Sequence, residues 1–204
     1  MEKRSMKRPL NWIIACTLAL IIFPVAARAG AEHVHDGDIV VGRTGAGALS
    51  VEYDFTEPTV LAPVNGLLTG WAGDEPGFDH LETDEPAEDF YILGSGANIV
   101  FEIVSIDPAL VGNPLTDALD APGEQLVLGD ETLHRHIDWL IDSTDPAFNP
   151  AQTVWEVQFR LLDTGSTQYD ASAVYTWGLT NVPEPGAASL LLAGVVLVVR
   201  RRRR

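Results

Sequence analysis

Short alternations of apolar and polar residues constrain the fold of this chain most strongly, because they have the period of a β-strand. Leu49–Phe55 and Trp155–Leu161 each alternate over seven residues, and Tyr175, Trp177 and Leu179 alternate with polar or small residues. Successive side chains on a strand point to opposite faces, so this period predicts half-buried strands. Between residues 30 and 181 we find neither the 3.6-residue period of an amphipathic helix nor an internal repeat.

Further apolar or β-branched runs lie between turn-forming clusters of Gly, Pro, Asn and Asp. They cover residues 38–42, 98–106, 124–128 and 133–141, with weaker runs at 67–71 and 90–93. Eight or nine short strands with many turns are typical of an antiparallel sandwich. We therefore predict an all-β fold, a single antiparallel β-sandwich or jelly-roll-like domain over residues 30–181.

The first 29 residues have the three parts of a secretory signal peptide. Basic residues precede an apolar run from Leu10 to Val25, and Ala27-Arg28-Ala29 has the pattern of a cleavage site. This predicts a signal helix, export through the Sec translocon and removal by signal peptidase. Cys16, the only cysteine in the sequence, lies in the segment that is removed. The exported domain must then be held together without disulfides.

The last 23 residues, 182–204, also contain three blocks in a fixed order. A proline-rich turn precedes an apolar segment at 187–199, for which we predict a transmembrane helix. A stop-transfer cluster follows, which prefers the cytoplasmic side of a membrane. The turn contains Pro183, Glu184 and Pro185, and the cluster is Arg200, Arg201, Arg202, Arg203 and Arg204.

This C-terminus resembles the PEP-CTERM sorting signal of exopolysaccharide-producing bacteria. The resemblance implies an exosortase as partner, a membrane transpeptidase that cuts near the Pro-Glu-Pro motif. It also implies a chain that is anchored in the inner membrane before processing and is then released to the cell surface or the extracellular matrix. The apolar segment has 13 residues, fewer than the roughly 20 that span a bilayer unaided. This shortness favours processing over a permanent anchor.

The predicted exported part is strongly acidic. Residues 30–181 hold 27 Asp and Glu against three Arg and no Lys, which gives a net charge of −24. Such a surface repels nucleic acid and anionic lipid and attracts cations, so we expect no nucleic-acid partner. Eight of these acidic residues lie between Asp74 and Asp89. We interpret that segment as a solvated loop, with calcium binding as the alternative, although the spacing of a calcium loop is absent.

Four of the five histidines occur in two H-x-H pairs, at residues 33–35 and 134–136. Residues two apart on a strand share a face, so each pair presents two imidazoles in one direction. Neutral imidazole is a good ligand for zinc or copper. We predict a metal site built from His134 and His136, with His35 and Asp38 as further candidate ligands and zinc as the possible cofactor. An exposed polar strand face is the alternative.

The H-x-H pair at residues 134–136 also has a wider context. The run from His134 to Trp139 has the form H-x-H-x-x-W, and a His-Asp element at 35–36 lies near the start of the domain. Together they resemble the choice-of-anchor M family of bacterial surface domains. The spacing of the early element differs from the usual one. The resemblance implies a zinc-associated surface protein and not a known enzyme.

Residues 163–165, Asp-Thr-Gly, follow an apolar strand as the active-site segment of an aspartic protease does. That chemistry needs two carboxylates that share a proton, and the sequence has no second copy of the motif. We interpret this segment as a turn between two strands, where Asp and Gly are favoured. No other catalytic signature is present, and we assign no catalytic residue.

Three classes of function remain open. The first is a non-enzymatic surface or matrix protein with a metal-stabilised β-sandwich. The second is a module that binds exopolysaccharide or cations, with Trp71 and Trp139 as candidate stacking platforms, because Trp155 and Trp177 lie on apolar strand faces and should be buried. The third is an extracellular hydrolase that uses His134, His136 and an Asp at zinc.

Overall fold

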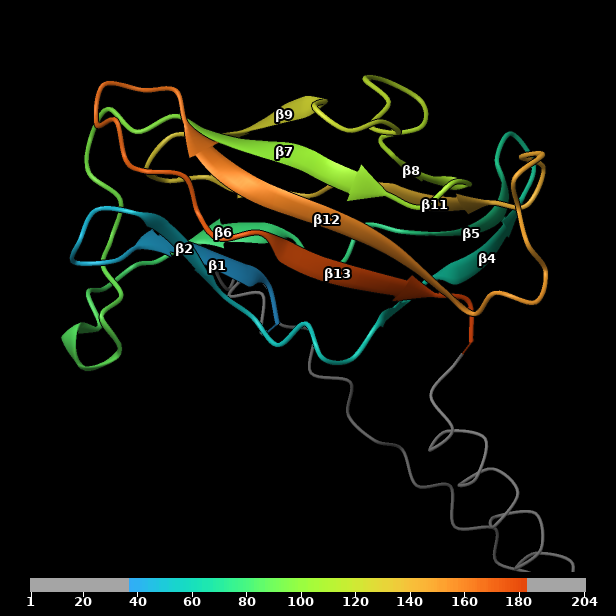
Figure 1. Ribbon diagram of the computed structural model, residues 1–204, viewed down its shortest axis with the longest axis horizontal. Helices are drawn as coiled ribbons and strands as arrows, with labels where there is room; N and C mark the ends of the chain where they lie inside the picture. The colour runs from blue at the N-terminus through green and yellow to red at the C-terminus, as the bar shows by residue number, and fades with distance from the viewer. Residues whose placement is uncertain (1–36, 183–204) are drawn as a thin grey trace, which may run out of the picture. The chain divides into compact units, whose positions relative to one another are not determined.

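The computed structural model describes residues 37–182, and β-strands make up most of its regular structure (Figure 1). The regular helical element in this range is one 3₁₀ turn, η1. The elements are β1 (Ile39–Arg43), β2 (Leu49–Glu52), β3 (Thr59–Val60), β4 (Ala62–Asn65), β5 (Thr69–Gly73), β6 (Phe78–His80), η1 (Pro86–Glu88), β7 (Ile99–Ile106), β8 (Leu110–Gly112), β9 (Gln125–Gly129), β10 (His134–Arg135), β11 (Trp139–Asp142), β12 (Val154–Asp163) and β13 (Tyr175–Thr180). The prediction of an all-β fold is confirmed.

The strands form three sheets, with the orders β10-β6-β1-β2, β4-β5-β11-β8 and β3-β13-β12-β7-β9. In Figure 1 the five-stranded sheet runs diagonally across the view, with β12 between β7 and β13. The two four-stranded sheets lie at opposite ends of it. The stretch from β10 to β11 passes from one four-stranded sheet to the other, and so does the stretch from β5 to β6.

All three sheets contribute side chains to one hydrophobic core. The rings of Phe78, Phe101, Trp139, Phe159 and Trp177 meet there, with centroids 4.8 to 6.5 Å apart for the pairs in contact. Each of these side chains is fully buried. Aromatic side chains remove a large apolar area from water, so the core needs no disulfide. Trp155 and Trp177 are buried, as their strand faces predict.

Two details of the sheet topology differ from the sequence prediction. Two strand pairs, β1 with β6 and β13 with β3, are parallel, so the sheets are mixed and not purely antiparallel. The partners in each of these pairs lie far apart in the chain, where no hairpin turn sets the strand direction. Residues 133–141 form two short strands in place of one, and residues 90–93 contribute isolated bridges.

The predicted acidic loop contains a strand. β6 lies within it, and Phe78 at its start is fully buried. The strand could not be recognised in the sequence because one aromatic residue among eight acids gives no alternating period.

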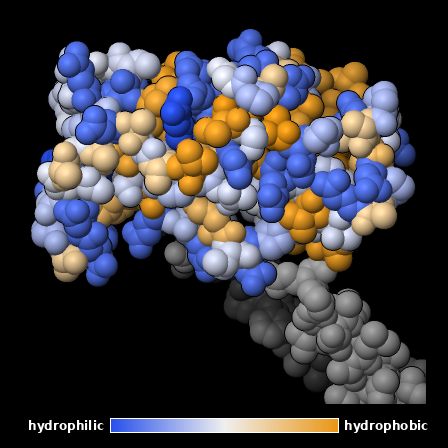
Figure 2. All heavy atoms as spheres, viewed as in Figure 1, coloured by the Kyte–Doolittle hydropathy of each residue, from blue (hydrophilic) through white to orange (hydrophobic). Residues whose placement is uncertain are grey.

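Figure 2 shows hydrophilic and apolar groups mixed over the face of the molecule in view.

Within residues 37–182 no helix is both long and apolar enough to cross a membrane. The predicted signal helix and transmembrane helix lie outside the described residues.

Candidate metal centre

Three neighbouring strands bring the predicted metal ligands together. β6 lies between β1 and β10, with Ile39 opposite Phe78 and His134 opposite Asp79. Continuing this register by one residue puts Asp38, Gly77 and His136 in one row across the sheet. Asp38, His134 and His136 each direct one ligand atom into the same space, and these three atoms all lie within 4.8 Å of one another.

Gly77 makes this convergence possible. Strands two apart in a sheet are separated by about 10 Å, so side chains on β1 and near β10 meet only if they lean over the strand between them. A Cβ atom at Gly77 would lie 2.7 Å from Cε1 and 2.8 Å from Nε2 of His136. The imidazole of His136 therefore occupies the space that any other residue at position 77 would fill.

The two imidazoles approach each other through their Nε2 atoms, which are 3.2 Å apart. Two nitrogens bound to one tetrahedral zinc at 2.0–2.1 Å lie about 3.3 Å apart. The pair of His134 and His136 therefore has the separation that a single zinc ion requires.

The other ring nitrogens face oxygen atoms. Nδ1 of His136 lies 2.9 Å from the carbonyl oxygen of Asp74. A carbonyl can only accept, so Nδ1 of His136 carries the proton and the lone pair is at Nε2. Nδ1 of His134 lies 3.7 Å from Oδ2 of Asp79. A proton held on Nδ1 by an oxygen acceptor is the usual arrangement around metal-bound histidines.

Asp79 is itself fixed in place by its neighbour. Its Oδ1 accepts hydrogen bonds from the backbone N–H of His80, at 2.8 Å, and from the ring Nδ1 of the same residue, at 3.0 Å. The Oδ2 atom of Asp79 remains directed at His134. Asp79 thus lies where it would accept a hydrogen bond from Nδ1 of His134 if a metal occupied Nε2.

Asp38 supplies the carboxylate from the start of β1. Its side chain is only 7 % exposed, and Oδ1 accepts a hydrogen bond of 2.9 Å from the backbone N–H of Gly77. That bond fixes the carboxylate beside the imidazole that lies over Gly77. Burial of a carboxylate is costly unless a donor or a cation compensates its charge. Asp38 therefore has the setting of a ligand and not of a solvated surface group.

The local charge favours a cation. Asp79 lies beside His134, and Oε2 of Glu75 lies 3.9 Å from Nδ1 of His136. Two imidazole nitrogens and one carboxylate oxygen form a donor set used by catalytic zinc sites, and imidazole also suits copper, iron and nickel. The residues present fit a zinc ion.

The remaining predicted site residues lie elsewhere. His35, the sorting motif at 183–185 and the arginines at 200–204 lie outside the described residues. Trp71 is half-buried and stacks on Phe148 with a centroid distance of 6.0 Å, so one of its ring faces is already covered. Its role as a stacking platform stays a prediction.

Trp139 is fully buried and packs edge-on against Phe101 and Trp177. A ring without an exposed face cannot stack on a ligand, and this burial contradicts the prediction of Trp139 as a stacking platform. The prediction was wrong because β11 begins at Trp139 and its residues 139–141 are all buried, whereas both residues of β10 are exposed.

The sequence analysis missed Gly77, Asp74 and Asp79. All three lie in the acidic segment that it interpreted as a solvated loop. The one signal available was the apolar Phe78 between Gly77 and Asp79, which is typical of a short strand with its two neighbours on the opposite face.

Asp163, in the protease-like motif, has a structural role. Oδ1 accepts hydrogen bonds from the backbone N–H groups of Asn98 and Gly165, and Oδ2 accepts from Thr167 and from the N–H of Tyr169. Burial raises the pKa of Asp163, but these hydrogen bonds outweigh it and keep the pKa below its usual value. The carboxylate holds a turn together, in line with the interpretation as a turn.

Comparison of the chain with protein-family models, with curated proteins and with solved structures finds no match.

Proposed function

We propose that this chain is an exported surface or matrix protein whose β-sandwich binds one zinc ion through Asp38, His134 and His136. The observation that carries the proposal is the convergence of three ligand atoms within 4.8 Å across Gly77. The hydrogen bond from Nδ1 of His136 to the carbonyl oxygen of Asp74 supports it, because this bond leaves the lone pair of Nε2 for a metal.

The role of the zinc in this proposal is structural and not catalytic. Asp38 precedes β1, and the two histidines lie at β10, so one ion connects the two strands on either side of β6. A ligand that binds only the folded state stabilises it, by about 2.7 kcal/mol at a concentration 100 times Kd. Such a link supports a domain that has no disulfide. His35 stays a candidate fourth ligand.

The test is metal analysis of the full-length chain, purified in detergent, stripped with a chelator and loaded with zinc. We expect one zinc per chain, and its loss in the double variant His134→Ala/His136→Ala. The control is His80→Ala, which removes an imidazole that holds Asp79 but is not a ligand, so this variant should still hold one zinc per chain. A chain that holds no zinc after loading, or a double variant that still holds it, would contradict the proposal.

The same preparation distinguishes a structural zinc site from a hydrolase. Hydrolysis of an activated ester that requires zinc and disappears in the double variant would replace the non-enzymatic function by a zinc hydrolase. We expect no zinc-dependent turnover.

We further propose that an exosortase processes the C-terminus after the Sec translocon has exported the chain. The support is the order of Pro183-Glu184-Pro185, the apolar segment and the arginines. In cells that carry an exosortase, replacing these three residues by alanine should keep the chain in the membrane fraction. Unchanged release would contradict the sorting proposal.

A further inference from the structure

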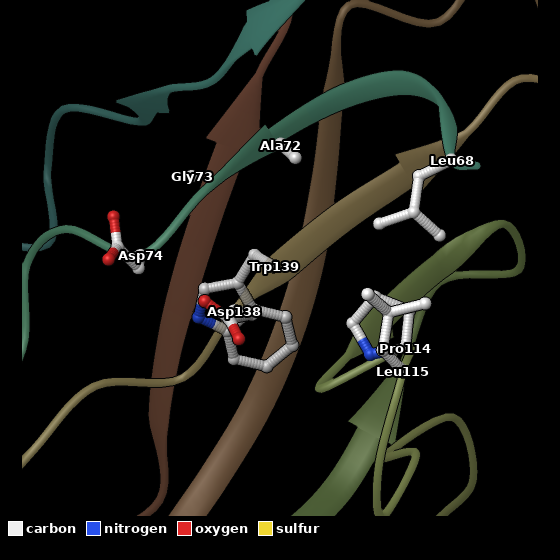
Figure 3. Close-up of a pocket in the computed structure, with 8 residues that line it drawn as sticks. All are labelled: Leu68, Ala72, Gly73, Asp74, Pro114, Leu115, Asp138 and Trp139. Carbon is white, nitrogen blue, oxygen red and sulfur yellow. The ribbon is translucent and has the colours of Figure 1, made fainter. Parts of the chain in front are cut away.

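A pocket on the β5–β11–β8 sheet, near the metal centre, is lined by two carboxylates and several apolar side chains. Its volume is about 360 Å³. Figure 3 shows Asp74 and Asp138 on one side of it, and Leu68, Pro114 and Leu115 on the other. The remaining lining residues are Ala72, Gly73 and Trp139, and none of the eight is basic.

The two carboxylates are cross-strand neighbours. Trp139 on β11 pairs with Gly73 on β5, so continuing the register by one residue puts Asp138 opposite Asp74. Like charges that are directly opposite on neighbouring strands repel and destabilise the pair. A cation between them removes that cost.

The opposite wall of the pocket is apolar. Leu115 is 62 % exposed, although a large apolar side chain gains by burial. Leu68 and Pro114 extend this surface. An inorganic cation would leave these side chains in water, whereas a ligand with a carbon body would cover them.

We propose that this pocket binds a small organic cation, a primary ammonium group on a six-membered ring. The ammonium lies between Asp74 and Asp138, and the ring covers Leu68 and Leu115. The volume suits a ligand of this size. An amino sugar and a cyclic alkylamine share this chemistry. The site uses no metal ligand, so this proposal does not depend on zinc binding.

The test is calorimetric titration of the full-length chain in detergent, after removal of metals with a chelator. The probes are two matched pairs, cyclohexylamine with cyclohexanol and glucosamine with glucose. We expect the amine of at least one pair to bind and its neutral partner to bind at least about tenfold more weakly, the size of one charge-assisted hydrogen bond. Tighter binding of glucosamine indicates a sugar ligand, and tighter binding of cyclohexylamine indicates an alkylamine.

Variants locate the ligand. Asp138→Asn should weaken amine binding about tenfold, and Leu115→Ala should weaken it several-fold. Glu156→Gln removes one negative charge from an exposed position on β12 and should leave binding unchanged. His134→Ala removes a metal ligand that does not line the pocket and should also retain amine binding, which separates this pocket from the metal centre.

Three results would overturn the proposal. The first is equal affinity for amine and neutral probes, or no binding of either amine. The second is an equal loss of affinity in Glu156→Gln and Asp138→Asn, which would indicate a diffuse effect of the acidic surface. The third is loss of amine binding in His134→Ala.

Discussion

Asp38 and Asp163 are both partly withdrawn from water, and they differ in what surrounds them. Four hydrogen bonds surround the carboxylate of Asp163, three from the turn that follows it and one from the backbone N–H of Asn98. Asp38 accepts a hydrogen bond from the backbone N–H of Gly77 and lies with the imidazoles of His134 and His136. A carboxylate that is surrounded by backbone donors stabilises the local fold, whereas a carboxylate beside imidazole lone pairs can bind a metal ion together with them.

The largest effect should follow from removal of the Asp38 charge. Asp38→Asn keeps the shape and an oxygen that accepts from Gly77, but it removes the anionic ligand. We expect zinc affinity to fall by at least about 100-fold, because changes around metal ligands alone cost 10- to 100-fold. Competition with a zinc-binding dye measures the affinity. Unchanged affinity would mean that Asp38 is structural, as Asp163 is.

A methyl group at position 77 should lower zinc affinity nearly as much as Asp38→Asn does, although it removes no ligand. Gly77→Ala brings a Cβ to within 2.7–2.9 Å of three ring atoms of His136. The imidazole must move, and we expect zinc affinity to fall about 100-fold. Gly45→Ala is the control, because there the nearest atom belongs to the exposed end of Asp89. Equal zinc affinity in both variants would contradict the proposed row across β6.

Substitution of Asp163 should lower the stability of the fold and leave zinc affinity unchanged. In Asp163→Asn the amide NH₂ cannot accept the hydrogen bonds of Thr167 and Tyr169, which Oδ2 accepts in the native chain. We expect the free energy of unfolding to fall by about 3–6 kcal/mol, the size of two bonds to a charged group. Urea unfolding of the metal-free protein measures it. Zinc affinity should not change, and a parallel loss of zinc binding would show that the two regions are coupled.

The lowered pKa of Asp163 predicts how acid acts on the fold. A carboxyl whose pKa is lower in the folded state contributes stability above its unfolded pKa, about 3.9. That contribution is lost as the pH falls through the folded pKa. In urea unfolding at a series of pH values below 5, the free energy of unfolding should fall more steeply with decreasing pH for the native chain than for Asp163→Asn. Identical slopes would contradict the assignment.

The strands and the histidine pair were predictable from local patterns, and the site was not. Alternation over residues 155–161 predicts which side chains face the core, and the H-x-H spacing predicts two imidazoles on one face. Asp38 and Gly77 join them only through the parallel pairing of β1 with β6. No local signal encodes a pairing between segments about forty residues apart, and the acidic composition around Gly77 concealed β6.

The smallest effect on zinc affinity is expected from substitution of Asp79, which lies beside His134. Neutral His134 has one ring proton, and it donates either from Nε2 to His136 or from Nδ1 toward Asp79. The carboxylate of Asp79 favours the second form, in which the lone pair at Nε2 points toward the metal. Asp79→Asn should weaken zinc binding about tenfold while one zinc per chain is retained. The absorption spectrum of the cobalt-loaded chain should also change, a response that a purely structural role would not produce. An affinity and a cobalt spectrum identical to those of the native chain would show that the contacts of His136 alone orient the pair.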